Sequence, residues 1–563
     1  MIDGSAALHP GLLLIAGGLL LAWLPRATRA LVALVLALAA LALAVQMPDG
    51  SYWQVDFLGH ALTLVHSDRL ARLFAIVFAL MAFVGVLYAM NQRSRLEIPA
   101  ALVYAGGAMG AAFAGDLITL FVFWETMALA STLVLWSAGS VLSGRAGMRY
   151  ALVHLLGGVL LMCGIAGHVS DTGSIAFGAM VADTPAHWLI LAGFLINAAA
   201  PPLSAWLPDA YPSASWSGTV FLSAFTTKTA VYVLLRGFAG TELLLYVGVF
   251  MIFYGIVYAL LENDMRRILA YSIVNQVGFM IAGAGLGSEL AVNGAAAHAF
   301  AHIVYKGLLL MSAGSVLLMT GRSRCSELGG LFRTMPLTTL CGTVGALAIS
   351  AFPLTSGFVS KSMVSQAAAD AHLAWLWLAL TAGSAGVFLH AGIKFPWFVF
   401  FQKDSGLRPP EPPWNMRLAM LLFALVCVGL GVYPAPLYAL LPFPVDYVPY
   451  TGAHVLSQLQ LLLFSGLAFF VMLPWLKRTL TITLDTDWLY RRGGAALARR
   501  VTDVVGQAGH QWESAVERLL ARGFARIHRH HGPAGLLART WPTGSMVLWV
   551  AILLASYLLL YYL

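Results

Sequence analysis

Seven ionisable residues stand inside long apolar stretches of this sequence. They are Glu125, His298, His302 and four of the chain's six lysines, namely Lys228, Lys306, Lys361 and Lys394. An ionisable side chain near the middle of a bilayer costs at least about 2.5–3.5 kcal/mol, so a row of such residues normally faces a hydrated path. The chemistry that these residue types can perform there is the movement of protons or cations.

Three of these residues follow one another in the run AHAFAHIVYKGLLLM. Steps of four residues place His298, His302 and Lys306 on one face of a helix. A free histidine changes protonation near pH ~6.5, so a spaced pair followed by a lysine is typical of a proton relay. A lone histidine would more often be a hydrogen-bonded core residue, but the stacked trio favours the relay.

The other ionisable residues stand singly. Glu125, in LFVFWETMALAS, needs a partner, and a static ion pair that locks two helices together is the alternative to a switchable one. Lys228 in AFTTKTAVY and Lys361 in TSGFVSKSM are far from any interface, where a lysine can load and release a proton as neighbouring charges change. Lys394, in HAGIKFPWF, could instead extend its ammonium group to the membrane surface.

The elements that carry these residues must be membrane helices. The chain has 563 residues, of which 60% are hydrophobic and 10% charged, with a mean hydropathy of +0.82. Such a composition predicts an all-α polytopic membrane protein. Apolar runs of about 20 residues, the length that crosses a bilayer, predict about sixteen transmembrane helices. The expected spans are 10–25, 28–46, 70–91, 97–114, 117–138, 147–168, 186–203, 217–236, 242–261, 267–287, 291–320, 336–364, 373–401, 415–434, 454–476 and 544–563.

The distribution of arginine and lysine predicts the orientation. Pairs such as Arg26 and Arg29, or Arg266 and Arg267, fall in alternate loops, whereas the opposite loops carry little beyond Arg69 and Arg236. Cytoplasmic loops are the basic ones, so we expect an outer amino terminus in a bacterial-type inner (cytoplasmic) membrane. The net charge of +8 then reflects contact with anionic lipids, and no nucleic-acid partner is expected.

The chain divides into six parts. We expect amino-terminal transmembrane helices with an outer loop at 1–95, a first five-helix repeat at 96–265, a second, inverted repeat at 266–405, further transmembrane helices at 406–476, an amphipathic cytoplasmic segment at 477–543 and a final membrane anchor at 544–563. Each repeat contains a helix broken near its middle, at Pro201-Pro202 and at Pro353. Inverted repeats with broken helices are a recurrent transporter design. In the outer loop, the alternation of Tyr52, Val55 and Phe57 indicates a small hairpin.

The segment after residue 477 has the pattern of a lateral helix. Apolar residues from Leu497 to Ile527 recur mostly at steps of three and four among arginines, and a helix from Ala495 to His530 would reach about 54 Å at 1.5 Å per residue. Such a helix is too polar to span a membrane. We expect it at the cytoplasmic interface, on anionic lipid or along a partner protein.

Several motifs, in order, resemble one family, the antiporter-like subunits shared by respiratory complex I and Mrp-type multisubunit Na+/H+ antiporters. They are FWE at 123–125, AWLPDAY at 205–211, the TTK lysine at 228, ENDMRRILAYS at 262–272, HAFAHIVYKGLL at 298–309 and GFVSK at 357–361. The resemblance implies proton-translocating roles for Glu125, Lys228, His298, His302, Lys306 and Lys361. Asn197 and Lys394 are possible accessory residues. It also implies other membrane subunits as partners, and protons and Na+ as the transported ions.

The sequence departs from the family at one important position. Where the family usually has a lysine nine residues before the tryptophan of WLPDA, this chain has Asn197 before Trp206. Glu125 thereby loses its customary partner. Three readings stay open: Lys228 substitutes, Glu125 is more readily protonated, or only the second half of the subunit moves protons.

The sequence offers no self-contained catalytic site, so we expect neither a cofactor nor a metal. It has no nucleotide-binding glycine pattern after a strand and no cysteine cluster, because the four cysteines are spread along the chain. The favoured hypothesis is cation/proton antiport. One alternative is a proton channel that energises a redox or inorganic-carbon uptake complex, and another is a membrane scaffold that transports nothing.

Overall fold

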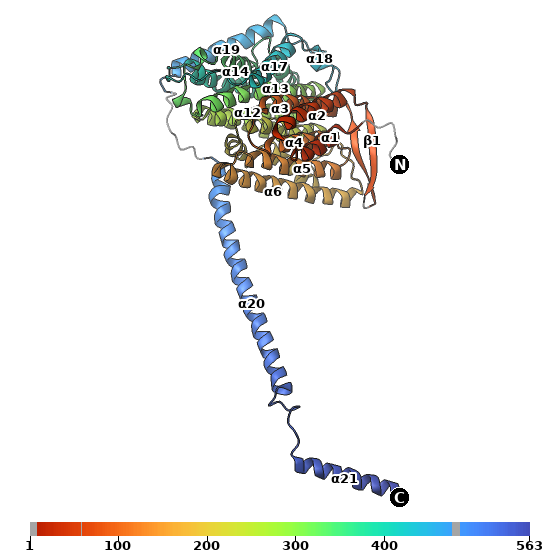
Figure 1. Cartoon of the computed structure of the whole chain (residues 1–563). Coiled ribbons are helices and arrows are strands. Elements are labelled where there is room, and N and C mark those ends of the chain that lie inside the picture. The colour runs from red at the N-terminus through yellow and green to blue at the C-terminus, as the bar shows by residue number, and fades with distance from the viewer. Residues whose placement is uncertain (1–7, 58, 476–484) are drawn as a thin grey trace. The chain divides into compact units, whose positions relative to one another are not determined.

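The computed structural model describes residues 8–57, 59–475 and 485–563, except for the side chain of Ala27. The chain separates into two compact units, Met1–Asp487 and Trp488–Leu563, which are described in turn (Figure 1). The expected boundary at 476/477 falls outside the described residues.

The first unit begins with helices and a hairpin. The elements are α1 (Pro10–Leu21), α2 (Arg26–Gln46), β1 (Gly50–Phe57), β2 (His60–Ser67) and α3 (Arg69–Ala89). The strands pair antiparallel, which confirms the expected hairpin. The hairpin stands at one end of the helices and contacts α3, α4 (Glu97–Phe113) and α5 (Leu117–Trp136) (Figure 1). Oδ1 of Asp68 caps α3 by accepting a hydrogen bond from the Ala71 amide at 2.8 Å.

The next helices include the first expected break. After α4 and α5 come α6 (Val141–Thr172), α7 (Pro185–Asn197), α8 (Trp206–Ala210), η1 (Tyr211–Ser213), α9 (Gly218–Leu222), α10 (Thr226–Gly237) and α11 (Leu243–Leu261). Helix α7 ends before Pro201-Pro202, since proline cannot continue the hydrogen-bond ladder. Two contacts connect the WLPDA segment to the helices beside the break. Trp206 Nε1 donates to the Ile196 carbonyl of α7 at 2.9 Å, and Arg149 on α6 forms an ion pair with Asp209 at 2.7 Å.

The second expected break is also present. The elements are α12 (Met265–Leu286), α13 (Glu289–Thr320), η2 (Cys325–Glu327), η3 (Leu331–Arg333), α14 (Pro336–Ile349), α15 (Ser356–Asp370), α16 (Ala374–Val387) and the π-helical turns η4 (Phe388–Lys394) and η5 (Trp397–Phe401). Residues 350–355, around Pro353, separate α14 from α15. Both breaks predicted from the sequence are therefore confirmed, and both expose backbone groups that the protein interior must satisfy.

Helix α13 lies at the centre of the first unit. It packs against α3, α12, α14, α15 and α17 (Trp414–Val432), and its residues from Ala291 to Val316 are buried (Figure 1). The unit is completed by α18 (Ala435–Tyr438) and α19 (Gly452–Met472), of which α19 packs against α16 and η4. The central helix thus carries its ionisable residues into the densest part of the core.

The described residues contain twelve helices long and apolar enough to cross a membrane. Four shorter apolar helices, α1, α4, α7 and α14, accompany them. The chain is therefore a mostly helical, multi-pass membrane protein, as the composition predicts. The number of sixteen crossings and the inverted relation of the two repeats stay predictions.

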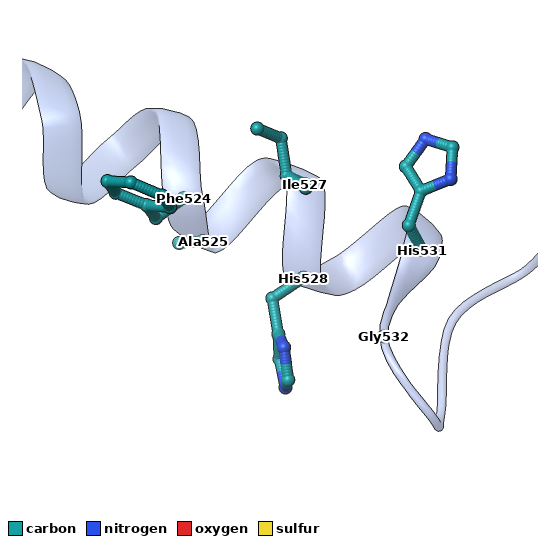
Figure 2. A pocket seen from close by; sticks show the side chains of 6 residues that line it. All are labelled: Phe524, Ala525, Ile527, His528, His531 and Gly532. Atoms are coloured by element: carbon teal, nitrogen blue, oxygen red, sulfur yellow. The ribbon is translucent and has the colours of Figure 1, made fainter.

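The second unit comprises η6 (Leu489–Gly494), α20 (Ala495–His531) and α21 (Thr543–Tyr562). The expected amphipathic helix is confirmed as the 37-residue α20, none of whose residues is buried within the chain. Near its end a shallow hollow is lined by Phe524, Ala525, Ile527, His528, His531 and Gly532. Figure 2 shows Ile527 and His531 on one side of the helix and His528 on the other, so the two histidines do not converge.

Candidate functional site

The three ionisable residues of α13 are fully buried and share one face, as the sequence predicts. His298 Nδ1 lies 3.2 Å from Ser360 Oγ on α15, and its Nε2 lies 3.2 Å from Gln276 Oε1 on α12. The rings of His298 and His302 are 6.3 Å apart. Neither ring nitrogen of His302 has a hydrogen-bond partner among the described residues. His302 is therefore a buried imidazole whose hydrogen-bonding capacity is not used by the described residues.

Lys306 and Lys228 hold their ammonium groups on hydroxyl and carbonyl oxygens. Lys306 Nζ donates to Ser272 Oγ at 2.9 Å, and Lys228 Nζ donates to the Ser223 carbonyl at 2.6 Å and to Thr227 Oγ1 at 3.2 Å. The Ser223 carbonyl is available because α9 ends just before it. These oxygens are neutral, and a neutral oxygen stabilises an ammonium group less than a carboxylate does.

Lys361 lies at the second helix break. Its Nζ donates to the Ile349 carbonyl, the last of α14, at 3.1 Å, and stands 4.7 Å from the centre of the Phe279 ring. The neighbouring Ser350 carbonyl accepts a hydrogen bond from Gln458 Nε2 on α19 at 3.2 Å. The break thus supplies carbonyl oxygens to two side chains from different helices.

A cavity of about 420 Å³ reaches Lys361 from between α15, α16 and α19. Polar side chains line much of it, namely Ser362, Ser365, Thr381, Ser384, His454, Ser457, Gln458 and Gln460. The imidazole of His454 stacks on Phe358 with ring centres 4.5 Å apart. These side chains offer hydrogen-bond partners to water along the cavity, which Lys361 also lines. The contribution of α19 was not predicted from the sequence, because His454 is the one ionisable residue of that helix.

These groups act on one another across three helices. The charges of Lys228 on α10, Lys306 on α13 and Lys361 on α15 all lie within electrostatic range of His302. A change of protonation at any of these lysines therefore alters the energy of a proton on His302. This arrangement of buried lysines around two histidines occupies the core of the first unit. The described residues contain no group of three or more potential metal ligands.

Glu125 is separate from this cluster. Its buried Oε1 has no hydrogen-bond partner among the described residues, and the hydrogen bonds of Lys228 go elsewhere. Asn197, fully buried at the end of α7, has its Oδ1 2.7 Å from Nδ1 of His154 on α6. His154 was not predicted as a site residue, because in the sequence it is a single histidine within an apolar span.

Two further polar groups are better explained as structural supports. Glu97, at the start of α4, accepts hydrogen bonds from Gln92, Ser137, Ser215 and Ser217. Lys394 donates to the carbonyls of Ala259, Leu260 and Glu262 at 3.0, 2.6 and 2.6 Å. It caps the end of α11 and is 4% exposed, so its ammonium group is held by the protein and not by solvent.

Replacing Lys394 with methionine should lower stability without stopping ion movement. The substitution leaves three carbonyls at the end of α11 without their charged donor, and one such bond is worth about 1.5–3 kcal/mol. Thermal denaturation of the purified complex should show a lower midpoint for Lys394→Met than for Lys403→Met, which alters an exposed loop lysine. Loss of flux with an unchanged midpoint would instead make Lys394 a carrier.

The chain is similar to known proteins over much of its length. The model of the family described as "NADH:quinone oxidoreductase/Mrp antiporter, TM" matches residues 114–386. A probable K+/H+ antiporter subunit of Rhizobium meliloti is 30% identical over 68% of this chain, which spans 42% of that relative's length. NADH-quinone oxidoreductase subunit N of Desulforudis audaxviator is 30% identical, with 59% of this chain and 72% of the relative covered.

One solved structure aligns along nearly the whole chain. A chain of an archaeal respiratory complex, the membrane-bound sulfane sulfur reductase, gives a TM-score of 0.72 at 23% identity and covers 98% of this chain and 99% of its own length. At this level of identity the match shows a shared fold. The fold extends beyond the family region into the carboxy-terminal helices.

Proposed function

The chain belongs to the NADH:quinone oxidoreductase/Mrp antiporter family, and on that premise we propose that it is a proton-translocating, antiporter-like subunit of a multisubunit membrane complex. The favoured activity is Mrp-type antiport of a monovalent cation, Na+ or K+, against protons. One observation carries the proposal: three buried lysines without carboxylate partners lie within range of His302, which has two unpartnered nitrogens among the described residues.

The geometry supports a path with two ends. Lys228, His302 and Lys306 form its middle, with His298 beside them, and Lys361 forms one end at the polar cavity. Under the predicted orientation this cavity lies in the outer half of the membrane, since the residues that line it from α16 and α19 lie in the outer halves of those two predicted spans. A proton arriving at Lys361 therefore leaves outward through the cavity, and Glu125 receives charge changes at the opposite end of the path.

Assembly belongs to the same proposal. We place the chain in a bacterial-type inner membrane with sixteen crossings, two inverted repeats and α20 on the cytoplasmic side. The exposed apolar side chains of α21, including Leu553 and Leu560, and the arginines of α20 suit lipid and partner subunits. The partner subunits select the coupled reaction.

A second function has its own support. The near-complete alignment with a chain of an archaeal respiratory membrane complex makes a subunit of a redox-driven proton pump the main alternative. The two functions differ in what drives the protons: a cation gradient in one and an electron-transfer reaction in the other.

Reconstitution of the whole complex into vesicles distinguishes these functions. Antiport predicts proton movement when a Na+ or K+ gradient is imposed without any electron donor. A redox pump predicts no response to either cation and proton movement only with donor and acceptor present. A scaffold would leave the complex's flux unchanged when Glu125 is replaced by glutamine.

Filling the cavity beside Lys361 should slow transport. Ser384 lines it from α16, and Ser384→Leu adds apolar bulk where water contacts polar groups. We expect proton flux in vesicles to fall about tenfold, equivalent to about 1.4 kcal/mol. Leu378→Phe, at an exposed position of the same helix, is the control. Equal fluxes in both variants would remove the cavity from the path.

A further inference from the structure

Two adjacent glycines on α6 bring Glu125 and Asn197 to one place. A methyl group added at Gly158 would overlap Oε1 of Glu125 from α5, and one added at Gly157 would lie 3.4 Å from Oδ1 of Asn197 on α7. At Gly158 only a glycine leaves room for the carboxyl group, and Gly157 lets the amide lie in contact with the same stretch of backbone. The two side chains therefore share a small polar site on α6.

His154 belongs to this site. It lies one helical turn before Gly158, and residues four apart on a helix have Cβ atoms about 5–6 Å apart on the same face. The side chain is 1% exposed, and its Nδ1 is 2.7 Å from Asn197 Oδ1. With the amide oxygen as acceptor, Nδ1 carries the hydrogen and Nε2 keeps its lone pair. That Nε2 has no hydrogen-bond partner among the described residues.

The surroundings of His154 contain no competing cation in hydrogen-bond contact among the described residues. Its ring packs on Tyr150 with centres 4.0 Å apart and on Trp206 at 4.7 Å. Arg149, the nearest basic residue along α6, is paired with Asp209. Tyr150, Asn197 and Trp206 are thus the side chains in contact with His154, from α6, α7 and α8. The carboxyl group of Glu125 lies against Gly158, one helical turn further along α6.

We propose that His154 is the proton-exchanging partner of Glu125 in the first half of this subunit, with Asn197 as the residue that positions it. The carboxylic acid of Glu125 transfers its proton to Nε2, directly or through one water molecule, and a carboxylate and an imidazolium result. The reverse transfer restores the two neutral groups. This inference rests on the proposed function, because it supplies the base that proton movement past Glu125 needs.

The hydrogen bonds beyond His154 lead toward Lys228. Tyr150 donates to Ser131 Oγ at 2.9 Å and lies 3.4 Å from Thr226 Oγ1, two residues before Lys228. Tyr104 lies 2.5 Å from the same Thr226 hydroxyl. The hydroxyl groups of Ser131, Tyr150 and Thr226 therefore form a hydrogen-bonded set that begins at the ring packed on His154 and ends two residues before Lys228 in the sequence.

Infrared titration combined with proton flux tests this pairing in the reconstituted complex. The Glu125 carboxyl band is assigned by its loss in Glu125→Gln. In His154→Gln we expect that band to grow at fixed pH, because the carboxylate has lost its cation, and we expect flux to fall about 10–100-fold. His154→Lys restores a base and should recover part of the flux. His168→Gln, the same change near the other end of α6, should alter neither reading.

The outcomes separate this inference from the proposed function. An unchanged carboxyl band and normal flux in His154→Gln, while Lys361→Ala is inactive, would overturn the pairing alone. If the wild-type complex moves no protons, the proposed function fails, yet the band still tests the pairing. If the His154→Gln complex does not assemble, the infrared bands of the His154 imidazole are compared between the wild type and Glu125→Gln. Bands that match at every pH would overturn the pairing.

Discussion

Lys361→Ala should abolish proton movement while the complex assembles normally. The substitution removes the ammonium group that joins the Ile349 carbonyl to the polar cavity, and no other lysine or arginine among the described residues lines that cavity. Loss of a positioned proton carrier typically costs about 10²–10⁴-fold in rate. We expect flux in vesicles to fall about 100-fold or more.

The matched control is Lys403→Ala, which removes a lysine from an exposed loop. Both variants should show the wild-type subunit composition after purification. Because the Lys361 side chain is 2% exposed, its loss also leaves a small void, so denaturation midpoints should be compared. Normal flux in an assembled Lys361→Ala complex would reject the proposed role of this residue.

Lys228 should prove equally sensitive, and in a way that distinguishes proton transfer from a fixed charge. Lys228→Ala removes the carrier, whereas Lys228→Arg keeps a positive charge that cannot be deprotonated in a protein. If Lys228 passes protons, both variants should lose flux about 100-fold. The measurement is proton uptake into vesicles under the gradient that drives the wild type.

A fixed structural charge predicts a different pattern. Arginine would then retain most of the flux, since its guanidinium group can donate to the Ser223 carbonyl and to Thr227. An active Lys228→Arg complex would therefore show that Lys228 is not a proton carrier. The role proposed for the cavity at Lys361 would not change.

Periodicity and proline positions predict much of this architecture. Steps of four place His298, His302 and Lys306 on one face of α13, and Pro353 marks the break that holds Lys361. The hairpin at 50–67 and the helical α20 follow from alternation and from three- and four-residue spacing. These features are determined by residues that lie close together in the sequence.

The remaining features depend on contacts between distant segments. His154 forms a hydrogen bond with Asn197, 43 positions later, and no motif near either residue predicts this contact. Gln458 reaches the Ser350 carbonyl from a helix more than a hundred residues away, and Lys394 caps a helix that ended 133 positions earlier. Such partners can be identified only when the helices are packed. From the sequence alone Lys394 could have extended to the membrane surface, whereas in the structure its side chain is buried.

The central claim is that the buried lysines exchange protons with the transport path. Because the chain has only six lysines, nitrogen-15 resonance of lysine-labelled protein in the assembled complex can resolve each Nζ. The account predicts that the signals of Lys228, Lys306 and Lys361 change between the charged and neutral forms across the pH range in which flux is observed. Three signals that remain charged throughout that range, in a complex that transports normally, would contradict it.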